Sequence, residues 1–162
     1  MHDKIDEKIY AYRYMATCTP GTEHIVVGEI TEAYERVNNA AIARGKVVFD
    51  CQSAVMDHNG LKCADNLYKL YKTFTVGNHK TDLADIGSLV CAIDFNSQGN
   101  ASPRILVSAS RRGRHTYSRF DVAEQVTNSL IATGKYIAGD SLDHDIAIRL
   151  DIDEDNCSVY KQ

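Results

Sequence analysis

The first half of the chain changes between the apolar spacing of a strand and that of a helix. In residues 9–17, Tyr10, Tyr12 and Tyr14 alternate with other residues, a period that is typical of a strand. Thr19-Pro20 combines a hydroxyl cap with a proline at the first helical position, and apolar residues from Val26 to Val37 follow at helical spacing. We expect Asn38-Asn39 to end this helix.

Shorter patterns predict the rest of this half. Residues 45–49 (GKVVF) are typical of a short strand, and residues 53–59 fit a short helix ended by Gly60. Residues 67–76 become β-branched and aromatic toward their end, so we expect a strand there, whose first residues also fit a helix. The order strand, helix, strand, short helix, strand is about the size of a split βαβ sandwich.

The middle of the chain predicts another helix and another strand. Apolar residues from Leu83 to Ile93 occupy one face of the expected helix, with Thr81 or Asp82 as its cap. A loop of small polar residues follows. Residues 104–110 then contain an apolar run (ILV) that is short enough for a buried strand.

The last part of the chain predicts a helix and then a hairpin. Ser118 and Asp121 fit a capping box at the start of a helix that we expect to end at Gly134. Residues 146–152 alternate strictly between apolar and polar side chains, which indicates a half-buried strand. A polar turn and the returning strand of a hairpin complete the sequence.

Strands and helices alternate in both halves, so the sequence predicts an α+β fold made of two small units. Gly77-Asn78-His79 is the expected boundary, which gives one domain at residues 1–77 and a second at 78–162. The sequence stops at the last strand of a hairpin. We therefore expect the second domain to be truncated at its C-terminus.

Composition narrows the class of protein. The chain has 162 residues, of which 44% are hydrophobic and 25% charged, and this balance excludes wholesale disorder. No apolar run approaches the ~18 residues of a membrane span, and the first residues lack the apolar core of a secretory signal. The five cysteines form no CxxC pair, which favours reduced thiols. We expect an intracellular protein, most simply a cytoplasmic one.

The distribution of charge is more informative than its sum. The net charge of −4 argues against a globally basic nucleic-acid binder. Residues 97–120, however, hold five arginines and no acidic residue, whereas residues 121–162 hold three Lys or Arg and nine Asp or Glu. One basic segment therefore lies in an otherwise acidic chain.

This basic segment contains the strongest candidate site, between a predicted strand and a predicted helix start. Guanidinium groups bind phosphate through two parallel hydrogen bonds, and a helix N-terminus adds free N–H groups and a positive dipole end. Hydroxyls supply further donors, glycine allows close approach, and aromatic rings stack on unpaired bases. A solvated loop paired with the acidic residues that follow is the alternative interpretation. The candidate RNA-binding residues are Arg111, Arg112, Gly113, Arg114, His115, Thr116, Tyr117, Ser118 and Arg119.

Motifs for other chemistry are weak or missing in the sequence. Residues 151–156 resemble the first half of a calcium loop, but Asn156 stands where an EF-hand needs glycine and Gln162 where it needs a carboxylate. The six histidines form no HExxH pair, and no P-loop, GxSxG or GxGxxG motif occurs. We therefore assign no catalytic residue, no metal ligand and no cofactor to this chain.

Four stretches, taken in order, resemble a known family. They are residues 16–23 (ATCTPGTE), 45–49 (GKVVF), 61–68 (LKCADNLY) and 111–118 (RRGRHTYS), the last with the pattern Arg-x-Gly-x-His-x-aromatic-Ser after a strand. Together they resemble the N-terminal region of THUMP-containing tRNA guanine-N2-methyltransferases.

This resemblance implies a ferredoxin-like domain followed by an α/β THUMP domain. It implies binding of the tRNA acceptor stem and its unpaired 3′ CCA end by the THUMP domain. It also implies a separate downstream domain that binds S-adenosylmethionine and transfers the methyl group, to which nothing in this chain corresponds. In place of the Trp-Lys pair expected near Ile137, Lys135 would serve as a phosphate contact.

The sequence thus predicts a tRNA-recognition module without enzymatic activity of its own, which presents tRNA to a methyltransferase domain outside this chain. Two alternatives remain open. One is a THUMP adaptor that presents tRNA to a separate modifying enzyme. The other is a protein-interaction or dimerisation module that does not bind RNA and uses its acidic surface. An independent small enzyme ranks below both.

Overall fold

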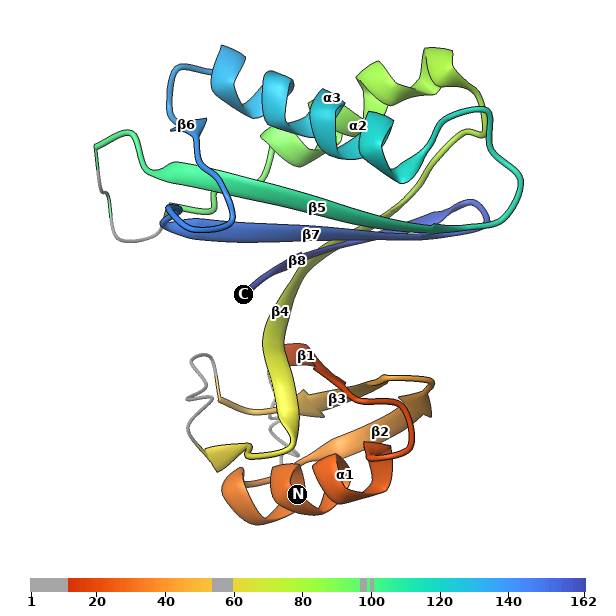
Figure 1. The fold of residues 1–162 in the computed structure, drawn as a ribbon, viewed down its shortest axis with the longest axis vertical. Coiled ribbons are helices and arrows are strands. Elements are labelled where there is room, and N and C mark those ends of the chain that lie inside the picture. Colours follow the sequence, from red (N-terminus) through yellow and green to blue (C-terminus); the bar gives the residue numbers. More distant parts are fainter. Residues whose placement is uncertain (1–11, 54–59, 97–98, 100) are drawn as a thin grey trace, which may run out of the picture. The chain divides into compact units, whose positions relative to one another are not determined.

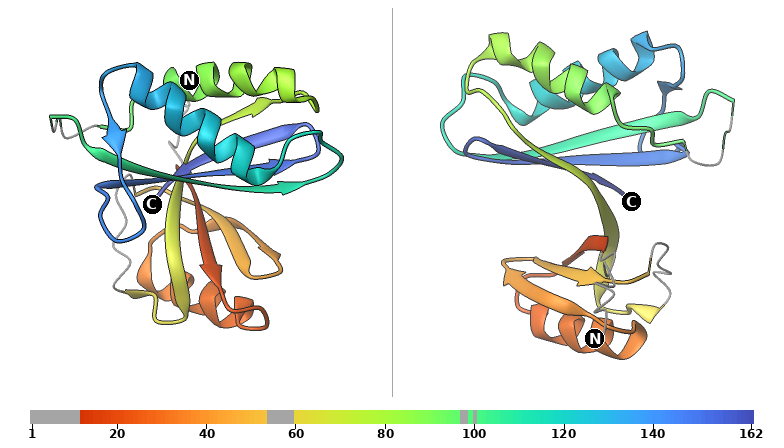
Figure 2. Two further views of the ribbon diagram at one scale, coloured as in Figure 1. Left: turned by 45° about the horizontal axis from the view of Figure 1, so that its top comes forward. Right: turned by 180° about the vertical axis from the view of Figure 1, so that it is seen from behind.

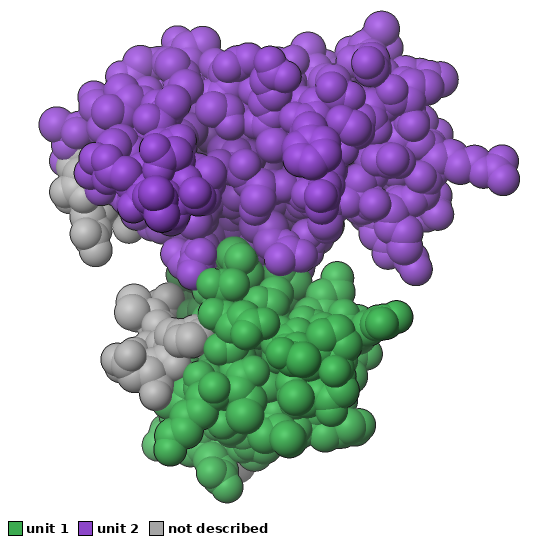
Figure 3. Space-filling model, in the orientation of Figure 1, with its two compact units in different colours: residues 1–69 green, residues 70–162 purple. Residues whose placement is uncertain are grey.

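A computed structural model describes residues 12–53, 60–96, 99 and 101–162. The chain forms two compact units, residues 1–69 and 70–162, which are drawn in different colours in Figure 3. The division falls inside strand β4 (Ala64–Thr75), which contributes residues to both units. It therefore lies before the boundary expected at Gly77, and the assignment of domains to residues 1–77 and 78–162 stays a prediction.

The first unit is an antiparallel sheet with one helix (Figure 1). Its elements are β1 (Tyr12–Cys18), α1 (Glu23–Ala33), β2 (Asn38–Ala43), β3 (Lys46–Cys51) and the first half of β4. The strands lie in the order β2-β3-β1-β4, and β1 pairs antiparallel with both β3 and β4. Val26 and Ile30 of α1 pack with Tyr14, Ala16 and Phe49 of the sheet to form the core.

The predicted start and the predicted end of the first helix were both wrong, and a strand that follows the helix was missed. The helix does not begin at Pro20, because Gly21 has a φ of +101°, which a right-handed helix cannot contain. It ends at Ala33 rather than at Asn38, because Tyr34 is already extended (φ −125°, ψ 141°). Residues 38–43, expected only to end the helix, form the edge strand β2. The short helix expected before Gly60 falls outside the described residues.

The other strands of the first unit confirm the sequence patterns. β1 and β3 overlap the strands predicted at residues 9–17 and 45–49, and each extends one or two residues beyond the predicted end. β4 is extended from Ala64 onward, so its first residues are not helical. The reason is its partner: β1 contacts β4 from Ala64 to Lys69, and these ladder hydrogen bonds are available only to an extended chain.

The second unit places two helices over one face of a mixed sheet (Figures 1 and 2). A single 3₁₀ turn, η2 (Lys80–Asp82), leads into α2 (Leu83–Cys91), and β5 (Arg104–Arg112) and α3 (Arg119–Ala132) follow. The chain ends with β6 (Ile137–Ala138), β7 (Ile146–Asp153) and β8 (Asn156–Lys161). The strand order is β4-β8-β7-β5-β6, in which β5 runs parallel to β6 and β7 while β7 and β8 form an antiparallel hairpin.

The core of this unit lies between the helices and the sheet, as the sequence patterns predict. Alternate residues of β7 from Ile146 to Ile152 are buried, and their neighbours are partly or fully exposed. Ile86 and Val90 of α2 pack into the same core. Val122, Val126 and Leu130 of α3 complete it. None of the helices in the described part of the chain is long and apolar enough to cross a membrane.

Candidate functional site

The basic segment connects the end of β5 to the start of α3, and we call residues 111–118 the basic loop. Arg111 and Arg112 were expected in a loop, but they form the end of β5 and pair with Ile152 and Asp153 of β7. The site therefore lies at the carboxyl end of the parallel pair β5 and β7. A ligand position at that edge of parallel strands is common in sheets covered by helices.

Hydrogen bonds fasten the basic loop to the segment that leads into α2. The backbone N–H of Thr116 donates to the carbonyl of Asn78 (2.8 Å), and the Thr116 Oγ1 accepts from the backbone N–H of Lys80 (2.8 Å). The Tyr117 hydroxyl donates to the carbonyl of Gly77 (2.7 Å). Two segments that each precede a helix are thus held side by side.

Gly113 turns the chain out of β5 in a conformation that favours glycine. Its φ is +116°, outside the range that other residues adopt readily. A Cβ at this position would lie 2.7 Å from Oε2 of Glu154 and 3.0 Å from Cε1 of His115. The glycine therefore allows both the turn and the close approach of the turn between β7 and β8.

The basic loop and the segment before α2 line a pocket of about 420 Å³ that is open to solvent, which we call the basic hollow. Three of its side chains are basic or imidazole groups from the basic loop. The residues that line it are Asn78, His79, Arg111, Gly113, Arg114, His115 and Thr116.

The arginines of the loop differ in how many hydrogen bonds and ion pairs their guanidinium groups make within the protein. The Arg112 guanidinium binds both carboxylate oxygens of Asp153, with Nε to Oδ1 at 2.7 Å and Nη2 to Oδ2 at 2.9 Å, and this hydrogen bond raises the pKa of Arg112. Arg111 donates only to neutral acceptors, the Gly113 carbonyl (2.9 Å) and the His115 Nδ1 (3.1 Å). Arg114 is exposed and makes no hydrogen bond or ion pair with another described residue. Arg111 and Arg114 therefore keep an uncompensated positive charge at the hollow.

His115 is held at both ring nitrogens. Its Nδ1 lies against a guanidinium, which can only donate, so Nδ1 must accept and carries no proton. Its Nε2 lies 2.6 Å from the carbonyl of Glu154, which can only accept, so Nε2 carries the proton. These partners assign the neutral Nε2–H tautomer, and the imidazole acts as a support that orients Arg111.

The predicted capping box at the start of α3 is confirmed. The Ser118 Oγ accepts from the backbone N–H of Asp121 (3.1 Å), and the Asp121 Oδ2 accepts from the backbone N–H of Ser118 (2.7 Å). The hydrogen bond from the Ser118 backbone holds the pKa of Asp121 below its usual value. The cap therefore fixes the point at which the basic loop becomes helix.

Tyr117 does not face solvent, contrary to the expectation that it stacks on an unpaired base. Its side chain is 1% exposed and belongs to the core of the second unit, beneath the loop. Burial raises the pKa of its hydroxyl, which donates to Gly77. The ring is a structural anchor that fills the core beneath the loop, and the His115 ring lies 5.0 Å from it between ring centres.

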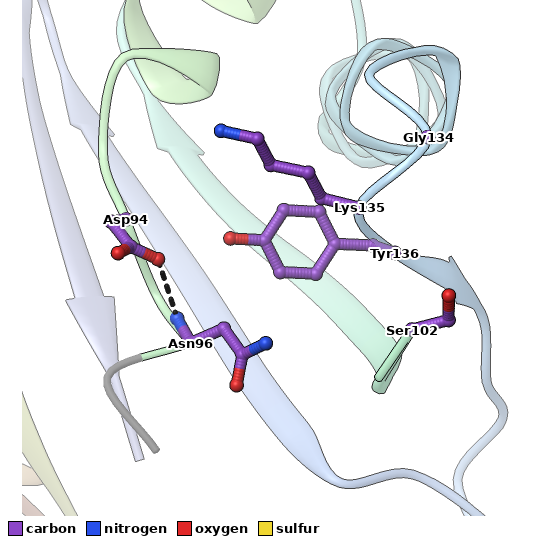
Figure 4. Close-up of a pocket in the computed structure, with 6 residues that line it drawn as sticks. All are labelled: Asp94, Asn96, Ser102, Gly134, Lys135 and Tyr136. Carbon is purple, nitrogen blue, oxygen red and sulfur yellow. Dashed lines mark hydrogen bonds between the residues drawn. The ribbon is translucent and has the colours of Figure 1, made fainter. Parts of the chain in front are cut away.

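Lys135 lies away from the basic loop. It follows α3, whose 14 residues span about 21 Å at 1.5 Å per residue, while the basic loop precedes that helix. Lys135 lines a second open hollow of about 320 Å³, drawn in Figure 4. The other residues of this distal hollow are Asp94, Asn96, Ser102, Gly134 and Tyr136. The structure thus separates Lys135 from the other candidate residues.

The sequence patterns missed one exposed ring beside the basic loop. Phe120, the second residue of α3, is 70% exposed, and the Arg119 guanidinium lies over its ring at 4.8 Å from the centre. The signal was present in the sequence: Phe120 falls off the face of α3 that Val122 and Val126 define. Single apolar side chains are common on protein surfaces, so it is the place of this ring, just after the basic loop and beside the Arg119 guanidinium, that makes it a candidate contact.

The described ranges contain no cluster of three or more His, Cys, Asp or Glu side chains that could hold a metal ion. The acidic residues at the turn between β7 and β8 serve other contacts. Asp153 pairs with Arg112, and Glu154 supplies its carbonyl to His115.

Comparison with known proteins identifies the fold. No protein-family model and no curated protein sequence matches the chain. Among solved structures, it is similar to TrmN from Thermus thermophilus (19% identity, TM-score 0.72) and to a predicted N6-adenine-specific DNA methylase from Listeria monocytogenes (17%, 0.64). It is also similar to a 4-thiouridine synthetase in complex with RNA and bound ATP (11%, 0.59).

Each of these likenesses covers 93% of this chain but only 45%, 40% and 41% of the respective structure. The chain therefore spans less than half the length of these proteins. At such identities the likeness shows the fold, and it confirms the α+β fold class predicted from the sequence.

Proposed function

We propose that this chain is an RNA-binding module that captures the acceptor stem and 3′ CCA end of tRNA. One observation carries the proposal: Arg111 and Arg114 keep uncompensated charge at an open hollow, beside the start of α3. Phosphate groups bind at such places because arginine donors and a helix N-terminus act together. Thr116 and Ser118 each keep a hydroxyl hydrogen that can be donated to RNA.

The comparisons support RNA as the ligand. One protein with the same fold was solved in complex with RNA, and another, the putative methyltransferase SMU.472, in complex with SAH. We propose that a catalytic domain outside this chain uses S-adenosylmethionine to methylate guanine N2, and that this module presents the tRNA to it. The ferredoxin-like first unit would then act as a spacer between the captured end and the modified nucleotide. Because tRNA is modified inside the cell, this proposal places the protein there.

The alternative of a protein-interaction module draws less support from the contacts. It requires the acidic residues after Asp121 to form a free working surface. Several of them are instead bound within the chain: Asp143 and Asp145 by Arg104, Asp151 by Ser110 and Arg149, and Asp153 by Arg112. A THUMP adaptor that serves a separate enzyme would use the same RNA contacts and differs only in where the catalytic domain resides.

The test is binding of the 162-residue chain to tRNA with an intact 3′ CCA end and to the same tRNA without that end, over a range of salt. Arg114→Ala removes one uncompensated charge from the basic hollow. Arg44→Ala is the matched control, because Arg44 is also exposed and also has no partner among the described residues, but lies in the β2–β3 turn of the first unit. We expect wild type and Arg44→Ala to prefer the intact end.

Arg114→Ala should bind more weakly and lower the slope of log K against log salt by about 0.7, the value for one contact to a single strand. Arg112→Ala should change the slope less, because the Arg112 guanidinium is already paired with Asp153 and would have to break that ion pair before it could bind a phosphate. Equal loss in Arg114→Ala and Arg44→Ala would reduce the interaction to unspecific charge. No binding of wild type to either tRNA would contradict the proposal and favour the protein-interaction module.

A further inference from the structure

Phe120 is the large apolar side chain that lies exposed beside the basic loop. The side chain is 70% exposed, and its only described ring contact is with the neighbouring Arg119 guanidinium, 4.8 Å from the ring centre. It contributes nothing to the core, because α3 buries Val122, Val126 and Leu130 on another face. A phenylalanine in this position leaves apolar surface in water for no gain in folding.

Phe120 follows just after the basic loop in the chain. It is the second residue of α3, directly after the cap Ser118 and Arg119. Side chains in a helix tilt toward its N-terminus, which is the end where the basic loop arrives. A nucleotide whose phosphate binds the loop would therefore find this ring next to it.

The other aromatic groups of the loop are not open to a base. Tyr117 is 1% exposed. His115 is bound at both ring nitrogens and has the Tyr117 ring 5.0 Å away. Phe120 alone among the described rings of residues 111–120 presents most of its surface to solvent.

We propose that Phe120 is the platform on which an unpaired base of the bound RNA stacks. The inference rests on the proposed RNA-binding function and adds to it the side chain that would hold an unpaired base. Base–aromatic stacking accepts any base and needs one that is not already stacked in a duplex, so Phe120 would serve the unpaired 3′ end and not the duplex stem. Arg119 packs on the ring and supplies positive charge to the stacked base through a cation–π contact.

The affinity test replaces the ring and keeps an apolar side chain. Phe120→Leu should bind tRNA with an intact 3′ end about 5- to 150-fold more weakly than wild type, the range measured for loss of one base–aromatic stack. It should bind tRNA without that end as wild type does. Leu142→Ala is the matched control, since Leu142 is 96% exposed but lies beyond β6 in the same unit, and this variant should bind like wild type.

A second readout reports the stack directly. The chain contains no tryptophan, so Phe120→Trp introduces at the proposed platform a single tryptophan, whose emission is distinguished from that of the nine tyrosines by exciting at the red edge of the absorption band. Its emission should be quenched on binding tRNA with an intact 3′ end, and far less by tRNA without it. Circular dichroism of each variant checks that the fold is retained, which we expect because the side chain is exposed.

The outcomes separate this inference from the proposed function. If Arg114→Ala weakens binding but Phe120→Leu does not, and the tryptophan of F120W is unquenched, the stacking platform is wrong and the RNA-binding function stands. If wild type binds no tRNA, both are wrong. If Leu142→Ala weakens binding as much as Phe120→Leu does, the effect is not stacking and the inference is overturned.

Discussion

Tyr117 offers a sharp test of whether the ring supports the loop or reads the RNA. The hydroxyl donates to the Gly77 carbonyl at 2.7 Å, and the side chain is 1% exposed within the core of the second unit. Tyr117→Phe removes only that hydrogen bond, which should lower the free energy of unfolding by about 1 kcal/mol. Tyr117→Leu also removes the buried ring, and large-to-small replacements of this kind cost roughly 2–4 kcal/mol.

Urea unfolding followed by far-UV circular dichroism measures both changes. For a chain of this size, about 1 kcal/mol corresponds to a shift of the melting temperature of about 2–4 °C. Affinity for tRNA is then measured well below the melting temperature of each variant. We expect Tyr117→Phe to bind like wild type, because the ring that fills the core is still present.

The reasoning would be refuted by one combination of results. If Tyr117→Leu unfolds like wild type but loses affinity for tRNA with an intact 3′ end, the ring is not a core residue and acts on the RNA. The pH dependence gives an independent check. Burial raises the pKa of Tyr117, so its contribution to stability is complete below the pKa of an unfolded tyrosine, about 10, and is lost as pH rises above it.

Three further predictions concern the turn, the cap and a thiol. Gly113→Ala should lower stability by about 1–3 kcal/mol, because alanine is strained at φ +116° and its Cβ would press on Glu154; a melting temperature equal to wild type would contradict this. Ser118→Ala should cost about 0.5–2 kcal/mol at neutral pH. Since the pKa of Asp121 is lowered in the fold, first by the Ser118 backbone N–H that an alanine at this position keeps, the Asp121 contribution is present above about pH 4 and should be lost as pH falls further in both wild type and this variant, as acid urea titrations can show. Burial raises the pKa of Cys157 to about 12, so iodoacetamide at pH 8 should label this thiol only after unfolding, as mass spectrometry of peptides can show.

Elements that bury one face were predictable from sequence. β7 buries every second residue from Ile146 to Ile152, and α3 buries Val122, Val126 and Leu130. Each spacing repeats the geometry of its element, because the residues that must avoid water recur with the period of the backbone. The capping box at Ser118 was also readable, because it depends on two residues close in sequence.

Elements without a buried face were missed. All six residues of β2 are exposed, so its sequence NNAAIA contains no alternation to detect. β6 consists of the exposed pair Ile137-Ala138 and is recognisable only from its pairing with β5. The helix starts only at Glu23 because Gly21 has a positive φ. The sequence shows that residue 21 is a glycine, but it does not show whether the φ of that glycine is positive or negative.

The candidate site was predicted as a segment but not as an arrangement. The basic loop and the helix start were found together because they are contiguous in sequence. The ion pair between Arg112 and Asp153, the burial of Tyr117 and the distance of Lys135 all depend on contacts between distant segments. The exposure of Phe120 likewise depends on which face α3 turns to the sheet.

The hydrogen bonds that fasten the basic loop to Asn78 and Lys80 determine how much conformational entropy remains to be lost when a ligand arrives. Ordering the backbone of a free loop costs about 1–2 kcal/mol for each residue. Here folding has already ordered it, so the proposed binding of RNA would immobilise the exposed arginine side chains without having to order the backbone. Calorimetry of binding should show a smaller entropic penalty than loss of order over the whole loop would produce, and Thr116→Val, which removes the acceptor for the Lys80 N–H, should increase that penalty.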